Sequence, residues 1–406
     1  MKLHFSPSVH LEGSVALPAS KSISNRVLII NALCEKKSII ENLAVCDDTT
    51  VLSNALKLES STIDIGAAGT AMRFLTAFCA IQPGTWILTG SERMKNRPIK
   101  ILVDALTHIG AKITYLEKEG FPPLQIVGTH LKGGKLSLDG SVSSQYVSAL
   151  MMIAPKLEEG LTMELTKNIN SEPYIRMTQQ IMAAYGVKSE FCNQTIDIRP
   201  QPYKSVAFDV ESDWSAASYW YELLAIHGAG KLQLPGLKKE SAQGDSKLME
   251  LFQMFGIKTT FTDEMAEIEI TPNKTERLEY DFSNEPDIVQ TLAVTCCMTQ
   301  TQFHFKGLSS LKIKETNRVA ALINELAKCG FELTEPAENE LAWNGSMKQP
   351  AEPISIATYD DHRMAMAFAP MALKMPITIE HPEVVSKSYP DFWKELLRFN
   401  NIQNLA

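Results

Sequence analysis

"VALPASKSISNRVLIINAL", at residues 15–33, runs from a short alternating strand through a polar turn into an apolar helix. The same order of strand, turn and helix returns at intervals of roughly 70 to 75 residues, and the helices are rich in Ala, Met and Leu. The copies occupy residues 15–33, 63–80, 136–155, 206–226, 280–298 and 354–373. Because this period exceeds that of the common solenoids, the sequence predicts globular repeats instead of an extended array.

A second repeated element is a helix that ends near a glycine and is followed by strands. It occurs at "LTHIGAKITYL" (106–116), "MAAYGVKSEF" (182–191), "FQMFGIKTTF" (252–261) and "LAKCGFEL" (326–333). Glycine is favoured just after a helix because it adopts the left-handed conformation without steric cost. Each repeat is therefore predicted to be mixed α/β, with strands that close a sheet around buried helices.

The composition is that of a globular protein of about two domains. The chain has 406 residues, of which 45% are hydrophobic and 21% charged, and its net charge is −8. This acidic balance argues against nucleic acid or an anionic membrane as partner, because either needs a basic field across a whole face. No apolar run reaches the roughly 18 to 20 residues that span a bilayer, and the N-terminal sequence lacks the pattern of a signal peptide. A cytoplasmic location is expected.

The sequence shows no sign of a cofactor or metal site. The seven cysteines have no CxxC or Cys/His ligand spacing and are predicted to be reduced core residues. No GxGxxG, GxxxxGK[ST] or HExxH motif occurs, so neither a cofactor nor a metal is expected. No heptad pattern or obvious apolar patch indicates an oligomer, so a monomer is expected.

The turns between strand and helix carry the residues that are able to bind a substrate or take part in catalysis. Helix N-termini present unpaired N–H groups and a partial positive charge, so several that converge form an anion site. The turns and their flanks add the cations Lys21, Arg26, Arg73, Arg93, Lys95, Arg97, Lys314, Arg318, Arg363 and Lys387. Taken singly, a serine or aspartate at such a turn is explained by N-capping, and a cation by surface solvation. Taken together, they favour the binding of an anion.

The segment "LKIKETNR" (311–318) places a carboxylate among cations at the start of a predicted helix. With Thr316 as a possible cap, Lys314 and Arg318 lie four residues apart and share a helix face. Glu315 points elsewhere on the same turn, where partial desolvation would allow it to act as an acid or base. A surface ion pair of little energetic weight is the alternative.

Nine short stretches, distributed from end to end of the chain, carry a family resemblance. They are "PASKSISNR" (18–26), "GAAGTAMR" (66–73), "RMKNRPI" (93–99), "DGSVSSQYVSALMM" (139–152), "SEPYI" (171–175), "EPDIVQTLA" (285–293), "KIKETNR" (312–318), "DDHRMAMAFA" (360–369) and "KSYPDFW" (387–393). In this order they resemble the motifs of the 5-enolpyruvylshikimate-3-phosphate synthase (3-phosphoshikimate 1-carboxyvinyltransferase) family.

That resemblance implies an α/β fold of two domains, the inverted α/β barrel, with six βαβαββ units, three in each domain. The first domain is expected to be discontinuous and to hold residues 1–19 and 213–406, and the second to hold residues 20–212. The chain would cross between them near Ala19 and near Asp213. The active site is expected in the cleft between the domains.

The family transfers the enolpyruvyl (carboxyvinyl) group of phosphoenolpyruvate to the 5-hydroxyl of shikimate 3-phosphate and releases phosphate, through a tetrahedral intermediate. This transferase reaction belongs to the shikimate pathway, which leads to chorismate and the aromatic amino acids. The resemblance implies a shikimate 3-phosphate site made of Lys21, Ser22, Arg26, Ser143, Ser144, Gln145, Ser171, Tyr174, Asp287, Ser310 and Lys314. It implies a phosphoenolpyruvate site made of Lys21, Gly69, Arg93, Gln145, Arg318, Arg363 and Lys387.

Catalytic roles are expected for three of these residues. Protonation of C3 of an enol ether makes C2 cationic and open to attack by a hydroxyl group. Glu315 is expected to donate the C3 proton and later to accept one, and Asp287 to take the proton of the 5-hydroxyl. Lys21 is expected to assist proton transfer and to stabilise the departing phosphate.

Three positions depart from the family pattern, and two other functions stay open. Ala67 and Ser310 each stand in place of an asparagine, and Phe74 stands in place of a proline. One alternative is the sister enzyme that transfers enolpyruvyl to a UDP-amino sugar, whose loop carries a cysteine where this chain has Arg93. The other is a non-catalytic anion-binding module, which Glu315 and Asp287 argue against because carboxylates weaken anion binding.

Overall fold

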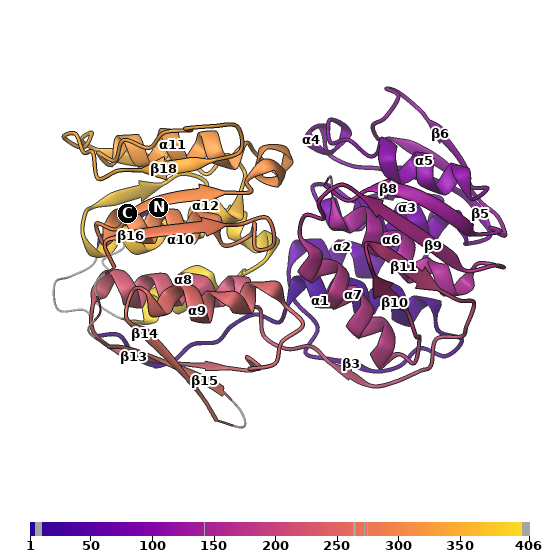
Figure 1. The fold of residues 1–406 in the computed structure, drawn as a ribbon, viewed down its shortest axis with the longest axis horizontal. Helices are drawn as coiled ribbons and strands as arrows, with labels where there is room; N and C mark the ends of the chain where they lie inside the picture. Colours follow the sequence, from indigo (N-terminus) through magenta and orange to yellow (C-terminus); the bar gives the residue numbers. More distant parts are fainter. Residues whose placement is uncertain (5–9, 142, 263–264, 272, 274, 400–406) are drawn as a thin grey trace. The chain divides into compact units, whose positions relative to one another are not determined.

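The computed structural model of the chain describes residues 1–4, 10–141, 143–262, 265–271, 273 and 275–399 (Figure 1). The chain divides into two compact units. Unit 1 consists of Met1–Pro18 and Glu211–Ala406, and unit 2 of Ala19–Val210. The crossings expected near Ala19 and Asp213 lie beside these boundaries.

The described part of unit 2 holds three sheets. The first has the strand order β4 (Thr62–Asp64), β5 (Gly84–Thr89), β7 (Leu124–Gly128) and β6 (Lys112–Tyr115). The second has the order β10 (Glu190–Cys192), β11 (Thr195–Ile198), β9 (Leu161–Thr166) and β8 (Gly134–Asp139), and the third pairs β12 (Phe208–Asp209) with β3 (Ile40–Glu41). The helices are α1 (Lys21–Leu33), α2 (Asp47–Ala55), α3 (Gly69–Ala80), α4 (Glu92–Lys95), α5 (Lys100–His108), α6 (Ser144–Ile153) and α7 (Glu172–Ala184).

Three sheets also occur in the described part of unit 1. They have the orders β14 (Ile257–Phe261), β15 (Met265–Ile270), β13 (Lys231–Pro235), β2 (Glu12–Ser14); β16 (Arg277–Asp281), β17 (Gln302–Lys306), β18 (Leu341–Trp343); and β1 (Lys2–Leu3), β20 (Ile377–Ile379), β19 (Ile354–Ile356). The α-helices are α8 (Trp214–His227), α9 (Leu248–Gln253), α10 (Val289–Met298), α11 (Arg318–Lys328), α12 (His362–Phe368) and α13 (Phe392–Arg398). Short 3-10 helices include η2 (Gly244–Lys247), η3 (Ser309–Ile313) and η5 (Pro382–Lys387).

One pairing rule runs through all of these sheets. Each contains one parallel pair of strands: β4 with β5, β8 with β9, β12 with β3, β2 with β13, β16 with β17, and β19 with β20. Parallel strands need a crossover connection, and α3, α6, α10 and α12 supply it for four of the pairs. Five of the six stretches predicted from the sequence contain a strand followed by a helix, and in the sixth, residues 15–33, the helix forms but the nearest strand, β2, ends at Ser14. The six helices divide into α1, α3 and α6 in unit 2 and α8, α10 and α12 in unit 1.

The two crossings of the chain fall inside the remaining two repeats. Strand β2 precedes α1 along the chain, yet it pairs with β13 in unit 1. Strand β12 precedes α8, yet it pairs with β3 in unit 2. Unit 1 therefore pairs β2, from before the first crossing, with β13, from after the second, whereas β3 and β12 of unit 2 lie near the two ends of one uninterrupted segment.

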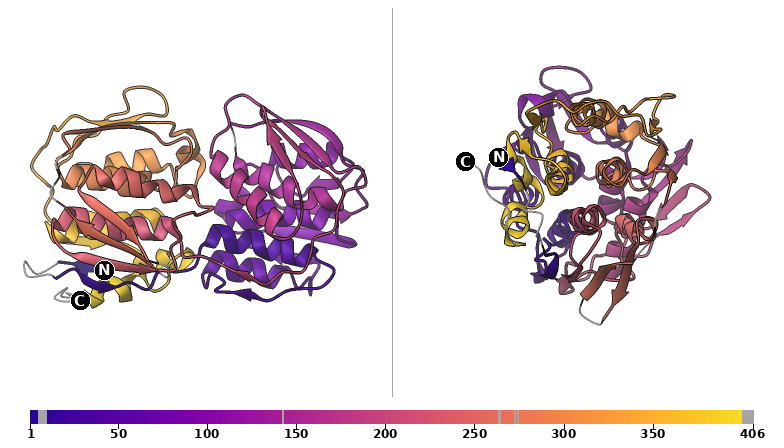
Figure 2. Two further views of the ribbon diagram at one scale, coloured as in Figure 1. Left: turned by 60° about the horizontal axis from the view of Figure 1, so that its bottom comes forward. Right: turned by 90° about the vertical axis from the view of Figure 1, so that its left-hand side faces the viewer.

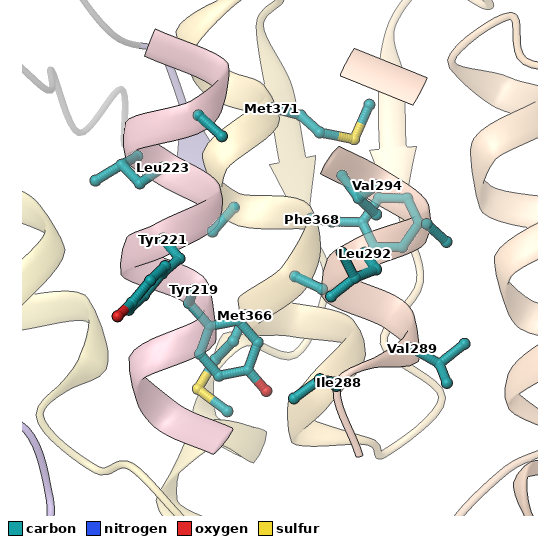
Figure 3. Close-up of a cluster of buried hydrophobic side chains, with 14 of the residues drawn as sticks. Tyr219, Tyr221, Leu223, Ile288, Val289, Leu292, Val294, Met366, Phe368 and Met371 are labelled. Atoms are coloured by element: carbon teal, nitrogen blue, oxygen red, sulfur yellow. The ribbon is translucent and has the colours of Figure 1, made fainter. Parts of the chain in front are cut away.

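The first helix of each repeat is a core helix. In unit 1, α8, α10 and α12 pack on one another, with Leu223, Leu292 and Phe368 among the buried side chains (Figure 3). In unit 2, α1, α3 and α6 pack on one another in the same way. The helices of each unit lie side by side (Figure 2). Helices that are apolar on most faces require such burial, and each begins where a strand has ended.

The structure also bears on the predictions about the cysteines and about membrane-spanning segments. Six cysteines are buried, as predicted, but Cys192 is exposed. It ends β10, the edge strand of its sheet, so the core prediction is wrong for this residue. Within the described ranges, no helix has both the length and the apolar character needed to cross a membrane.

Candidate active site

Lys21 is the first residue of α1 and is held by a carboxylate. The preceding Ser20 caps the helix, since its hydroxyl accepts a hydrogen bond from the Ile23 N–H at 3.4 Å. The Lys21 ammonium lies 3.2 Å from Asp48 Oδ2 near the start of α2, and both side chains are largely buried. Asp48 is a site neighbour that the sequence reasoning did not identify.

Arg26 lies one turn further along α1 and is buried among neutral groups. Its Nε donates to Thr178 Oγ1 at 2.7 Å and its Nη2 to Ser148 Oγ at 3.1 Å. Backbone carbonyls of Ser22 and Tyr174 accept its other hydrogen bonds, at 2.9 and 3.3 Å. Burial lowers the pKa of Arg26 to about 10, although Tyr174 acts in the opposite direction. Within the described residues the guanidinium therefore has no acidic partner, and it lies beside Ser22 of α1 and Tyr174 of α7, which are both predicted to bind the substrate.

The aromatic neighbours of Arg26 include one of the departures from the family pattern. The guanidinium carbon lies 5.4 Å from the ring centre of Phe74 and 5.8 Å from that of Tyr174. A cation is attracted to an aromatic face at these distances. Phe74, which stands where the family has proline, therefore lies against Arg26.

The predicted serines and glutamine gather at the starts of α6 and α7. Ser143 caps α6 by accepting a hydrogen bond from the Gln145 N–H at 3.3 Å, and Ser144 is buried beside it. The Gln145 side chain reaches Thr70 Oγ1 of α3 at 3.2 Å. Ser171, the residue before α7, is buried with a left-handed backbone of φ 57°. Such strain in a residue other than glycine is typical of ligand sites.

At the start of α3, the structure brings Arg97 to Gly69. A Cβ added to Gly69 would lie 2.9 Å from Arg97 Cζ, so glycine permits this close approach. Arg97 Nε is buried and has no hydrogen-bond partner among the described residues. Arg93, which the resemblance implied for this site, is exposed. Arg97 is four residues further on, and the sequence offers no signal that favours one arginine over the other.

Arg73 connects the start of α3 to the segment that follows α4. Its Nη1 donates to the Gly69 carbonyl at 3.0 Å, and its Nη2 donates to the Pro98 carbonyl at 3.3 Å. The buried guanidinium therefore ties the start of α3 to the segment that carries Arg97.

Arg318 is the centre of the site residues in unit 1. Its Nε donates to Asp361 Oδ2 at 2.7 Å, its Nη1 to Asp287 Oδ1 at 3.2 Å and its Nη2 to Glu315 Oε2 at 3.1 Å. Burial acts to lower the pKa of Arg318, but the charges of Asp361, Glu315 and Asp287 outweigh it and raise that pKa. Both carboxylates that are expected to be catalytic, Asp287 and Glu315, thus share one guanidinium.

Asp287 is surrounded by three cations. Besides Arg318, the Arg363 Nη2 lies 3.1 Å from Asp287 Oδ2, and the Lys314 ammonium lies 3.7 Å from Oδ1. Arg363 Nη1 also donates to the Asp287 carbonyl at 2.9 Å. Burial lowers the pKa of Lys314, with the charge of Asp287 opposing that shift. The arrangement holds a carboxylate, a lysine and two arginines within reach of one ligand.

Glu315 joins Lys387 to the same cluster. The Lys387 ammonium donates to Glu315 Oε1 at 2.7 Å, while Arg318 occupies the other oxygen. Six residues predicted for the site, from four separate segments, are therefore brought together in unit 1: Asp287, Lys314, Glu315, Arg318, Arg363 and Lys387. Ser310 lies nearby in sequence, half-buried in η3.

The helix expected to carry Lys314 and Arg318 on one face begins later than predicted. Helix α11 starts at Arg318, and its cap is Asn317, whose Oδ1 accepts a hydrogen bond from the Ala320 N–H at 3.2 Å. Lys314 has extended backbone after η3. The prediction of a shared helix face with Thr316 as cap is wrong, but both cations still reach Asp287.

Comparisons with known proteins point in one direction. A model of the family described as EPSP synthase (3-phosphoshikimate 1-carboxyvinyltransferase) matches residues 5–58 and 52–396. Over 399 residues the chain is 48% identical to a 3-phosphoshikimate 1-carboxyvinyltransferase of Bacteroides fragilis, which covers 98% of this chain and 97% of that protein. It is 37% identical over 420 residues to a protein of the same name from a Sulfurovum species, covering 96% and 97%.

The fold is similar to that of a solved EPSP synthase from Acinetobacter baumannii. The TM-score is 0.79 at 20% sequence identity, and the match covers 98% of each chain. At that identity the likeness supports the architecture of the repeats.

Proposed function

This chain belongs to the EPSP synthase (3-phosphoshikimate 1-carboxyvinyltransferase) family, and from that premise we propose which of its residues carry out the family's reaction. The activity is transfer of the enolpyruvyl group of phosphoenolpyruvate to shikimate 3-phosphate, with release of phosphate. The observation that carries the assignment of roles is the cluster around Arg318. It holds two acidic groups, Asp287 and Glu315, on one guanidinium.

Glu315 is proposed to move the proton at C3 of phosphoenolpyruvate. The oxygens of Glu315 pair with Arg318 and Lys387, and cationic partners favour the carboxylate form of an acid. A substrate phosphate that binds Lys387 removes one of these cationic partners, so protonated Glu315 becomes accessible and can donate to C3. After the 5-hydroxyl has added to C2, the Glu315 carboxylate takes a proton from C3 as phosphate leaves.

Asp287 is proposed to accept the proton of the 5-hydroxyl group. Its cationic neighbours Arg318 and Arg363 hold it ionised, as a base must be. The guanidinium groups of the same two arginines are proposed to donate hydrogen bonds to the phosphoenolpyruvate carboxylate. Lys314, beside Asp287, is proposed to position the hydroxyl.

The residues of unit 2 are proposed to bind the carboxylate and phosphate of shikimate 3-phosphate and the phosphate of phosphoenolpyruvate. Arg26, with Ser22, suits the carboxylate of shikimate 3-phosphate because the guanidinium has no acidic partner among the residues that the structure describes. The hydroxyls and backbone at Ser143, Ser144 and Ser171 suit its phosphate, with Gln145 between the ligands and Tyr174 along the ring. Lys21 is proposed to neutralise the departing phosphate.

The phosphoenolpyruvate phosphate is proposed to lie at the start of α3, beside Gly69. The guanidinium of Arg97 against Gly69 favours this arginine for the role over the exposed Arg93. The meeting of the two sets of residues in a cleft between the units stays a prediction, as do the monomeric state and the cytoplasmic location.

An assay of phosphate release tests the assignment. The protein is incubated with phosphoenolpyruvate plus shikimate 3-phosphate, with phosphoenolpyruvate plus a UDP-amino sugar, and with each compound alone. Release is expected only in the first mixture. Release with the UDP-amino sugar would assign the sister reaction, and binding of both substrates without release would assign a non-catalytic module.

A further inference from the structure

Unit 1 contains a buried aspartate, close to the Arg318 cluster, that has no role in the proposed reaction. Asp245 lies in η2, and its Oδ2 accepts a hydrogen bond from Ser215 Oγ in the first turn of α8. Its Oδ1 is buried without a hydrogen-bond partner in the part of the chain that the structure describes. Burial of a half-satisfied carboxylate is costly, so its presence here calls for a reason beyond packing.

Ser215 connects Asp245 to an arginine of the site. Arg363 Nη2 donates to Ser215 Oγ at 3.5 Å and lies 3.1 Å from Asp287 Oδ2. Asp245, Ser215, Arg363 and Asp287 therefore form one connected chain of polar contacts. A change of charge at one end of it alters the electrostatic environment of Arg363.

The loop that carries Asp245 is fixed to the start of α8. Gln243 Oε1 accepts a hydrogen bond from the Trp214 N–H at 3.1 Å, and Gln243 Nε2 donates to the Ser212 carbonyl at 2.8 Å and to Glu211 Oε1 at 2.9 Å. These contacts involve residues immediately beside Ser215 in sequence, so they fix the position of Asp245 relative to Ser215.

We propose that Asp245 is a positioning residue whose protonation state sets how strongly Arg363 binds the substrate carboxylate. The proposal rests on the proposed function, in which Arg363 holds the carboxylate of phosphoenolpyruvate. With Asp245 neutral, the positive charge of Arg363 faces the substrate with no added competitor. With Asp245 ionised, a second buried negative charge competes with the substrate for the same guanidinium.

The charged groups around Asp245 place this change in the neutral pH range. Burial raises the pKa of Asp245 to about 7, and the charge of Asp287, ahead of α10, acts in the same direction. Arg363 of α12 and the hydrogen bond from Ser215 lower it, and Asp213 at the cap of α8 raises it. On the side of α9, the charge of Glu250 is paired with Lys247.

The test is the KM for phosphoenolpyruvate at saturating shikimate 3-phosphate, measured from about pH 6 to about pH 8.5. For the wild-type protein, KM is expected to rise about tenfold above pH 7, with little change in kcat, because one buried negative charge has been added. In Asp245→Asn the KM stays low across the range. The control Asp391→Asn makes the same substitution at an exposed side chain and is expected to follow the wild type.

A second variant keeps the proposal testable if Asp245→Asn does not fold. Ser215→Ala removes a hydrogen bond that favours ionised Asp245, so the rise in KM is expected to move to higher pH. Parallel pH profiles in wild type and Asp245→Asn, or an unmoved rise in Ser215→Ala, overturn the proposal alone. A wild-type protein that releases no phosphate from the two substrates overturns the proposed function, and this role of Asp245 with it.

Discussion

Arg26 of unit 2 and Arg318 of unit 1 are both buried arginines, yet their surroundings are opposite in charge. Arg26 donates to hydroxyl and carbonyl oxygens, which carry no net charge. Arg318 donates to three carboxylates, those of Asp287, Glu315 and Asp361. Burial accordingly lowers the pKa of Arg26 to about 10, whereas the carboxylates raise the pKa of Arg318.

The difference separates two tasks of the proposed reaction. A buried cation with neutral partners has electrostatic attraction left over for an anionic substrate. A cation with several carboxylates has less of this attraction left for a substrate anion, but it keeps those carboxylates ionised and in place to exchange protons. The comparison therefore assigns the binding of shikimate 3-phosphate chiefly to unit 2, and proton transfer, beside the carboxylate of phosphoenolpyruvate, to unit 1.

The largest expected effect is on turnover, from a change on the unit 1 side. Glu315→Gln keeps the shape of the side chain but cannot donate or accept the C3 proton, so kcat is expected to fall by about 10³- to 10⁴-fold. Affinity for shikimate 3-phosphate, measured by calorimetry, is expected to survive, because Arg26 is untouched. Near-normal phosphate release would remove Glu315 from the mechanism.

Removal of the Arg318 charge is expected to destabilise the fold. In Arg318→Gln, the carboxylate of Asp361, which is fully buried, loses its ion pair, and the free energy of unfolding is expected to fall by about 3 to 5 kcal/mol. Urea denaturation measures this loss. The matched variant Arg26→Gln leaves no buried carboxylate behind, so its loss is expected to be smaller. Equal losses in the two variants would contradict the contrast between the arginines.

Binding of shikimate 3-phosphate is the test of the unit 2 side. Arg26→Gln is expected to weaken that binding by about 10- to 100-fold, the range for hydrogen bonds to a charged group. The variant Arg176→Gln is the control, because this arginine of α7 is exposed and pairs with Glu172. Calorimetric titration of both variants gives the result, and unchanged affinity in Arg26→Gln would place the substrate carboxylate elsewhere.

The smallest effect concerns a buried acid that has no cationic partner among the described residues. Glu222, in α8, is fully buried, and neither of its carboxyl oxygens has a hydrogen-bond partner within the described ranges. Burial raises the pKa of Glu222 well above its usual value. The folded protein therefore keeps a proton that the unfolded chain releases above about pH 4.5, so stability contributed by this group declines as pH rises.

The substitution Glu222→Gln tests whether this group makes the protein less stable as pH rises. At about pH 8 the variant is expected to be more stable than the wild type by about 1 kcal/mol, and the difference is expected to shrink towards about pH 4. Thermal unfolding at the two pH values measures it. A variant that is less stable than the wild type at the higher pH would show that the carboxylate is ionised and satisfied.

The repeats could be predicted from the sequence because their signals are local. Strand alternation, a polar turn and an apolar helix follow one another within about twenty residues. The predicted glycines after helices, Gly110, Gly186, Gly256 and Gly330, all have positive φ in the structure. Five of the nine motifs that carry the family resemblance also lie within these repeats.

The contacts that assemble the site could not be predicted, because they join residues that are far apart in sequence. Asp361 is 43 residues from Arg318, and no periodicity links them. The choice between Arg93 and Arg97 depends on how the segment around α4 folds against Gly69. Asp48 and Asp245 carry no motif of their own, so only the tertiary structure shows what they contact.

One measurement tests the central claim, that a unit 1 carboxylate transfers a proton to C3 of phosphoenolpyruvate. The wild-type protein is supplied with both substrates in deuterium oxide, and the enolpyruvyl product is analysed by mass spectrometry and NMR. Proton transfer adds a solvent-derived deuterium to C3, which becomes a methyl group, and one of the three hydrogens of that methyl group is then lost. Deuterium is therefore expected in the methylene group of the product. Product formed at full rate with no deuterium at C3 would contradict the account.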